Sequence, residues 1–283
     1  MMLLSIQSHV AYGHVGNAAA VFPLQRLGIE VLPVHTVQFA SHVGYGPPQG
    51  SVMDAAALGA VIDGLEARGA LARCDGVLSG YLGSPALGAV VLDAVVRVRR
   101  HNPRAVYCCD PVIGDIDGGI YVAPEIVAFF RDCAIPQATI VTPNAFELAE
   151  ISGRAIETLN DAKAAIVHLQ RQGPRVVLAT SLHLADTPKN MMDVVVADGA
   201  RVARVRTPLL PGVLHGTGDL IAALFTAHYL RTGVAERAAE AAVSSVYGVI
   251  ARTLSERRAE LALVVAQDEF VAPTRGFIAE PVS

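Results

Sequence analysis

The chain has 283 residues, of which 52% are hydrophobic and 17% are charged, and its formal net charge is -4. So small a net charge excludes an extended basic surface, so we expect no nucleic-acid partner and look to small molecules as ligands. The sequence has no leader-like amino terminus and no run of about 18 uninterrupted apolar residues. We therefore expect a soluble, cytoplasmic protein without a membrane segment. No linker-like stretch divides the chain, which predicts a single domain over 1–283.

Six short apolar runs, rich in Val, Ile and Leu, are typical of strands that are covered on both faces. In chain order they are residues 3–7, 31–37, 76–78, 105–109, 138–141 and 175–179. Helix-length segments lie between them, one beginning at Ser84-Pro85 and another after Asn160. Because parallel strands need such crossovers, the alternation predicts a three-layer α/β/α sandwich with a mostly parallel central sheet.

The carboxyl-terminal part departs from this alternation. Residues 191–197 and 201–205 flank a Gly-containing turn and predict an antiparallel hairpin at the edge of the sheet. Two alanine-rich helices are expected over 219–230 and 235–253, and residues 261–265 are a candidate closing strand.

Four polar segments come directly after predicted strands, namely 8–17, 110–121, 142–147 and 180–181. The carboxyl ends of parallel strands meet at one edge of a sheet, which is where open α/β proteins bind ligands. We therefore expect these segments to form one site.

The segment from Gly216 through Thr217 and Gly218 to Asp219 lies at the entrance of an expected helix. Main-chain N–H groups at a helix start can hold a phosphoryl group, and Asp219 would take the proton of a substrate hydroxyl. Aspartate is also a favoured N-cap residue, so an ordinary helix start explains the same residues. The sequence leaves both interpretations open.

Carboxylates gather after the fourth and fifth predicted strands. Asp110 and Asp115 lie in a stretch of three aspartates and three glycines, residues 110–119, which could bind a hydrated Mg²⁺ or form a solvated turn. Glu147 either lies beside Asp110 around the metal of a nucleotide or pairs with Asn144 as a helix cap.

Several familiar fingerprints are missing. The chain has no GxxxxGK[ST] loop, no GxGxxG after a strand, no fixed histidine pattern for zinc and no metal-type cysteine spacing, so we expect reduced, structural thiols. With Lys163 and Lys189 as its only lysines, a kinase of this sequence must neutralise a triphosphate with metal ions, helix ends and arginine. Neither lysine is well placed for the Schiff base of a pyridoxal-phosphate-dependent enzyme.

These motifs, in this order and over essentially the whole chain, resemble the pyridoxal kinases of the ribokinase-like superfamily. The amino-terminal ones are Ser8-x-Val10-x-Tyr12-Gly13-x-Val15-Gly16-Asn17, Thr36-Val37-Gln38-Phe39, His42-x-Gly44-Tyr45 and Ser79-Gly80-Tyr81. The others are Asp110-Pro111-Val112-Ile113-Gly114-Asp115-Ile116-Asp117-x-Gly119-Ile120-Tyr121-Val122, Thr142-Pro143-Asn144-x-Phe146-Glu147-Leu148, Thr180-Ser181 and Gly216-Thr217-Gly218-Asp219-Leu220.

The resemblance implies ATP-dependent phosphorylation of the 5'-hydroxymethyl group of pyridoxal, pyridoxine and pyridoxamine, a reaction of vitamin B6 salvage. It implies ATP and Mg²⁺, with K⁺ or Na⁺ as a monovalent ion, and a homodimer. The catalytic residues would be Asp219, Gly216, Thr217 and Gly218, and the substrate would be bound by Ser8, Val15, Val43, Gly44, Tyr81 and Asp219. The nucleotide would be bound by Asp110, Asp115, Thr142, Glu147, Thr180, Thr207, Leu214, Gly216 and Gly218, and the metal by Asp110, Tyr121 and Glu147.

Two features depart from this pattern: Val43 stands where many members of the family carry a threonine that contacts the substrate ring, and residues 184–189 and 207–213 match the family poorly. Other interpretations remain. The nearest alternative is a hydroxymethylpyrimidine kinase, which shares the fold and the acid–base chemistry. A sugar or nucleoside kinase is a more distant alternative. The third is a non-catalytic regulatory protein that binds a B6 vitamer and has lost activity.

Overall fold

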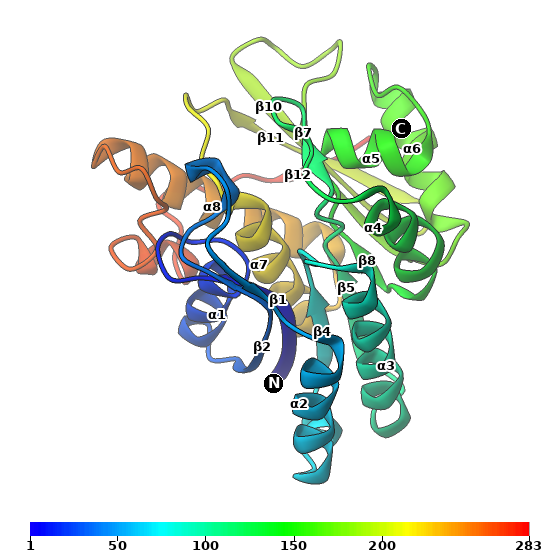
Figure 1. Ribbon diagram of the computed structural model, residues 1–283. Coiled ribbons are helices and arrows are strands. Elements are labelled where there is room, and N and C mark those ends of the chain that lie inside the picture. Colours follow the sequence, from blue (N-terminus) through cyan, green and yellow to red (C-terminus); the bar gives the residue numbers. More distant parts are fainter. Residues whose placement is uncertain (283) are drawn as a thin grey trace.

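The computed structural model describes residues 1–282, and ten of its strands form one sheet in the order β12-β11-β10-β9-β8-β5-β4-β1-β2-β3 (Figure 1). In chain order these strands are β1 (Met2–Val10), β2 (Glu30–Phe39), β3 (Gly50–Val52), β4 (Gly76–Ser79), β5 (Val106–Cys109), β8 (Ile140–Val141), β9 (Val176–Leu182), β10 (Met191–Asp198), β11 (Arg201–Pro208) and β12 (Ala279–Pro281). A separate two-stranded ribbon pairs β6 (Gly114–Asp115) with β7 (Gly119–Ile120).

The six predicted strands are confirmed as the parallel centre of the sheet, β2-β1-β4-β5-β8-β9. The predicted hairpin is β10-β11, which turns at Gly199 with a positive φ of 59° and pairs antiparallel with β9. The mostly parallel sheet with an antiparallel pair toward one edge is the expected architecture.

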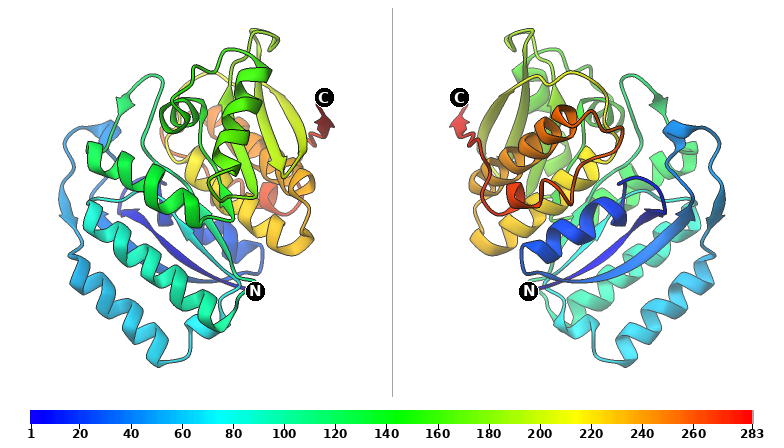
Figure 2. Two further views of the ribbon diagram at one scale, coloured as in Figure 1. Left: turned by 90° about the vertical axis from the view of Figure 1, so that its right-hand side faces the viewer. Right: turned by 90° about the vertical axis from the view of Figure 1, so that its left-hand side faces the viewer.

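Helices cover both faces of the sheet (Figure 2). They are α1 (Asn17–Arg26), α2 (Ala55–Ala67), α3 (Pro85–His101), α4 (Pro124–Phe129), α5 (Ala145–Ser152), α6 (Leu159–Gln170), α7 (Thr217–Thr232) and α8 (Ala235–Ser255). Helices α2 to α6 pack on one face and α1, α7 and α8 on the other. Within residues 1–282, no helix combines the length and the apolar character needed to cross a bilayer.

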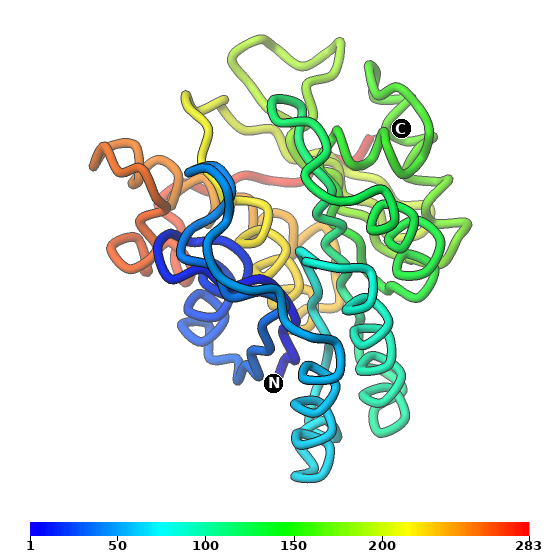
Figure 3. Tube along the Cα trace, viewed as in Figure 1, coloured from blue at the N-terminus to red at the C-terminus, as the bar shows by residue number. Residues whose placement is uncertain are grey.

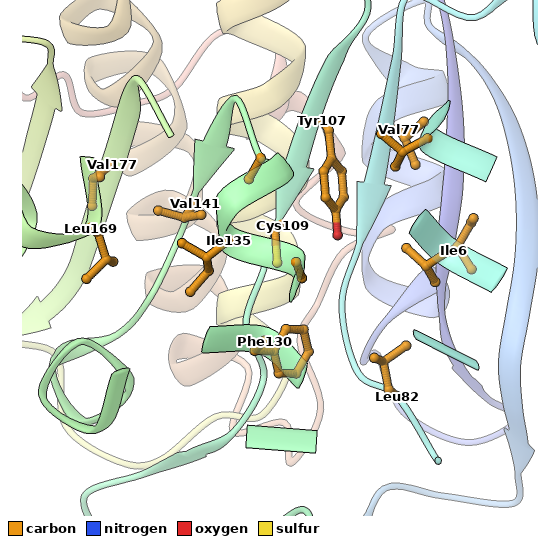
Figure 4. Packing of buried hydrophobic residues seen from close by; sticks show 14 of the residues in the cluster. Ile6, Val77, Leu82, Tyr107, Cys109, Phe130, Ile135, Val141, Leu169 and Val177 are labelled. Carbon is orange, nitrogen blue, oxygen red and sulfur yellow. The ribbon is translucent and has the colours of Figure 1, made fainter. Parts of the chain in front are cut away.

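Neighbouring strand residues contribute to opposite cores because side chains alternate along a strand. Ile6 and Val77 belong to the core under α2 to α6, whereas Leu3 and Leu78 belong to the core under α1, α7 and α8. Figure 4 shows the first core, where strand residues meet Phe130 and other side chains of the helical layer. These two cores make the sheet a rigid support for the loops at its edge.

Two local predictions were wrong. Residues 261–265 form a turn instead of a strand: Leu261 and Leu263 are buried against α7 and α8, and β12 takes the edge of the sheet. Burial explains the apolar run without strand pairing, and a short apolar run does not distinguish the two. Helix α6 begins before Asn160, because Thr158 and Asp161 form a capping box.

Candidate active site

The loops after β1, β5 and β8, together with β9 and the start of α7, meet at the carboxyl edge of the sheet. Thr142 Oγ donates to Asp110 Oδ1 at 2.7 Å, and the N–H of Thr180 donates to the carbonyl of Pro143 at 2.9 Å. The start of α7 reaches the 11–16 loop, because a Cβ on Gly216 would lie 1.7 Å from the carbonyl oxygen of His14. The expectation that these segments lie together is confirmed.

The start of α7 separates the two interpretations of Asp219. The N-cap is Gly216, with a left-handed φ of 84°, and Asp219 lies in the first turn of the helix, where its carboxylate accepts from the main-chain N–H groups of Gly16 and of Asp219 itself. The first N–H groups of a helix have no partner within it. Gly218 is exposed, and a Cβ there would meet no atom within 4 Å, so the turn has an open side on which an anion can bind.

Three carboxylates influence one another next to this turn. Burial, with the nearby charges of Glu147 and Asp219, raises the pKa of Asp110 well above its usual range. Burial also raises the pKa of Glu147 to about 7, against the opposing effect of main-chain donors, and that of Asp219 to about 6. Burial is the main cause for all three, and neighbouring carboxylates add to it for Asp110 and Glu147, so added positive charge would stabilise the ionised forms.

Glu147 holds two loops together. Its carboxylate accepts from the N–H groups of Ile113 at 2.9 Å and Asn144 at 2.9 Å, and it completes a capping box with Asn144 at the start of α5. Asn144 Nδ2 in turn donates to the carbonyl of Gly114 at 2.8 Å. The capping interpretation is therefore confirmed, and the same contacts keep Glu147 within electrostatic range of Asp219.

A divalent cation fits beside Asp110 and Glu147 when waters and substrate phosphates complete its set of ligands. Across residues 1–282, no three His, Cys, Asp or Glu side chains converge closely enough to hold a metal ion by themselves. Mg²⁺ retains several waters and is commonly bound through one or two carboxylates and substrate phosphates. Buried, unneutralised Asp110 and Glu147 fit that kind of binding.

The other residues expected to bind the nucleotide or the metal differ from one another in their burial and local contacts. Asp115 accepts from the N–H groups of Asp117 at 3.0 Å and Gly118 at 2.5 Å, so it shapes the β6-β7 turn. Tyr121 is exposed and its ring packs against Gly118, where a Cβ would lie 2.6 Å from it. Thr207 is buried on β11, and Leu214 is half-buried just before α7.

The residues expected at the substrate ring lie on the amino-terminal side. Ser8 is buried against Gly16, where a Cβ would come within 2.3 Å of the Ser8 carbonyl and hydroxyl oxygens. Val15 and Tyr81 are half-buried and pack on a small apolar cluster at the ends of β1 and β2. Val43 is 48% exposed and lies with Gly44 in a 3₁₀ turn, Val43–Tyr45.

One residue at this edge has no counterpart in the sequence motifs. Glu260, in the segment after α8, accepts hydrogen bonds from Tyr45 Oη at 2.7 Å and the His14 N–H at 3.1 Å, and pairs with His42 Nε2 at 2.9 Å. Glu260 belongs to none of the sequence motifs. It directly precedes residues 261–265, whose apolar run predicts a strand and gives no sign of a functional residue beside it. Figure 3 shows the segment after α8 beside the loop that follows β1.

Known proteins resemble this chain over its whole length. The family described as phosphomethylpyrimidine kinase matches residues 61–261. The pyridoxal kinase PdxY of Granulibacter bethesdensis is 52% identical over 99% of each chain, and that of Deinococcus radiodurans is 50% identical over 99% of this chain and 96% of its own. The pyridoxal kinase of Leishmania donovani, solved with ADP and pyridoxine, has 30% identity and a TM-score of 0.93, covering 100% of this chain and 99% of its own.

Proposed function

The chain belongs to the pyridoxal kinase family, and we propose that Asp219 is the general base with which it phosphorylates the 5'-hydroxymethyl group of pyridoxal from ATP. Relatives named pyridoxal kinase, and solved homologues that hold ADP with pyridoxine or pyridoxamine, support this substrate class. The observation that carries the assignment is the position of Asp219: Gly216 is the N-cap of α7, and the Asp219 carboxylate lies in the first turn beside the open side of Gly218, held by the main chain of Gly16.

The reaction needs little beyond positioning and charge stabilisation. The hydroxymethyl oxygen attacks the γ-phosphorus, the bond from that phosphorus to the β–γ bridging oxygen breaks, and ADP leaves. Asp219 takes the hydroxyl proton, which its pKa of about 6 allows because the carboxylate is mostly ionised at neutral pH. The N–H groups of Gly216, Thr217 and Gly218 would hold the migrating phosphoryl group.

Asp110, Thr142 and Glu147 would hold the phosphate and metal end of the nucleotide. Bound Mg²⁺ would neutralise the phosphate charge and relieve the mutual repulsion of the buried carboxylates. Asp115, Thr180, Thr207 and Leu214 would line the nucleotide, with Tyr121 in the neighbouring turn. Ser8, Val15, Val43, Gly44 and Tyr81 would surround the ring. The family resemblance further supports a K⁺ or Na⁺ requirement, a homodimer and a cytoplasmic location.

A second candidate substrate follows from the matched family, whose description is phosphomethylpyrimidine kinase. A coupled assay of ADP release compares pyridoxal, pyridoxine, pyridoxamine and hydroxymethylpyrimidine at equal concentrations, each with MgATP. We expect pyridoxal to have the highest kcat/KM. A higher value for hydroxymethylpyrimidine would assign the chain to the second activity, and no ADP release with any substrate would favour a binding protein.

A further inference from the structure

Glu260 connects three segments that are far apart in the sequence. Its Oε1 contacts Tyr45 Oη and His42 Nε2, and its Oε2 accepts from the main chain of His14. The Glu260 side chain is only 14% exposed, and the adjoining Leu261 is anchored in the core under α7 and α8. The carboxylate is therefore a fixed point to which two loops attach.

The 42–46 loop depends on this attachment because it has little other support. No residue of its 3₁₀ turn, Val43–Tyr45, is buried, and the Val43 and Tyr45 side chains are 48% and 50% exposed. A turn with so little apolar burial is held by hydrogen bonds and ring contacts. The His42 ring lies between those of Tyr45 and His215, with centroid distances of 4.7 and 4.3 Å.

Close contacts at three glycines connect the 42–46 loop and the 11–16 loop with the start of α7. A Cβ on Gly44 would lie 2.6 Å from His215 Nε2, and one on Gly13 would lie 2.5 Å from Glu260 Oε2. The His14 carbonyl fills the space that a Cβ on Gly216 would need. Glu260 thus sets where Val43 and Gly44 stand relative to the phosphoryl-binding turn.

We propose that Glu260 is a positioning residue for substrate binding: it holds the 42–46 loop at the ring side of the site, through His42 and Tyr45. This inference rests on the proposed function. It assigns to the carboxyl-terminal segment a role in B6 vitamer affinity, whereas ATP binds at the other side, around Asp110 and Glu147.

The test compares Glu260→Ala and Glu260→Gln with the matched control Glu256→Ala. Glu256 lies in the same segment but pairs only with the surface residues Arg252 and Arg258. We expect Glu260→Ala to raise the KM for pyridoxal about tenfold or more, with less than about a twofold change in the KM for ATP. Calorimetric titration with pyridoxal alone should show the same rise in Kd. Glu260→Gln retains an acceptor oxygen and should restore most of the affinity, and Glu256→Ala should match the wild type.

Three results would overturn the proposal. One is a pyridoxal KM within about twofold of the wild type in Glu260→Ala. Another is a loss of kcat with an unchanged Kd for pyridoxal, which would connect Glu260 to phosphoryl transfer. The third is an equal rise of both KM values with a lowered Tm, which would indicate a general structural role. Wild-type activity is measured first, so a wild type without vitamer kinase activity contradicts the proposed function itself.

Discussion

In the proposed site, the phosphate side, formed by Asp110, Thr142 and Glu147, is buried, whereas residues 43–46 on the ring side are exposed. The first side consists of residues at strand ends and a helix cap, joined by hydrogen bonds to the main chain and to each other. The second depends on contacts to Glu260, which is 218 residues from His42 in the chain. The difference suggests that phosphoryl transfer is built rigidly into the sheet edge, while ring recognition can change through a few loop contacts.

Removing Asp219 should have the largest effect. We expect Asp219→Ala to lower kcat by roughly 10²-fold or more, because a poorly nucleophilic alcohol then loses its proton acceptor. Steady-state kinetics with pyridoxal and MgATP measure this. The KM for pyridoxal should change little, and Asp219→Asn should resemble Asp219→Ala. Near-wild-type turnover would refute the assignment of the base.

The phosphate side is tested next through its charge. Glu147→Gln keeps the size of the side chain and removes the carboxylate, so we expect the Mg²⁺ concentration for half-maximal activity to rise roughly 10–100-fold. Activity is titrated with free Mg²⁺ at constant ATP. Glu150→Gln, an exposed position on the same helix α5, is the control. Equal Mg²⁺ requirements in the two variants would contradict a role of Glu147 near the metal.

The junction between the two sides is the close contact of the start of α7 with the 11–16 loop, and it is tested at Gly216. An alanine there has both a positive φ of 84° and a Cβ 1.7 Å from the His14 carbonyl, so the 11–16 loop must move. We expect kcat to fall roughly tenfold, less than for outright loss of anion-binding donors. The control is Gly233→Ala at the other end of α7, where φ is 65° but no atom lies within 4 Å. If both variants lower the Tm equally and leave kcat unchanged, the junction has no catalytic role.

The pH dependence should report the ionisation of Asp219. Burial raises its pKa to about 6, and only the ionised form accepts a proton, so activity is lost as pH falls. We expect kcat/KM at saturating Mg²⁺ to drop about tenfold per pH unit below pH 6. Asp219→Asn should lack this decrease. A wild-type profile that stays flat to pH 5 would contradict the assignment.

The smallest effect is expected on the ring side at Val43. A threonine there adds a hydroxyl next to the ring at an exposed position, so Val43→Thr should lower the KM for pyridoxal roughly 2–10-fold. Val61→Thr, an exposed valine on α2, is the control. An unchanged or raised KM would mean that the 42–46 loop does not bring residue 43 to the ring.

Much of the fold could be predicted because the relevant signals are local. The apolar runs gave all six parallel strands, and the Gly199 turn gave the hairpin β10-β11. One exception, residues 261–265, is apolar because of burial against α7 and α8, which a short run cannot distinguish from a strand.

The sequence by itself determined which residues the proposed function uses: carboxylates that follow strands, and a glycine-rich helix start with an aspartate. Only the tertiary structure decided that Gly216 is the N-cap of α7, that the Asp219 carboxylate accepts from the main chain of Gly16, and that Glu260 joins the 42–46 loop to the 11–16 loop. Strand periodicity and helix capping involve residues a few positions apart, whereas these contacts arise only when the folded sheet brings distant segments to one edge.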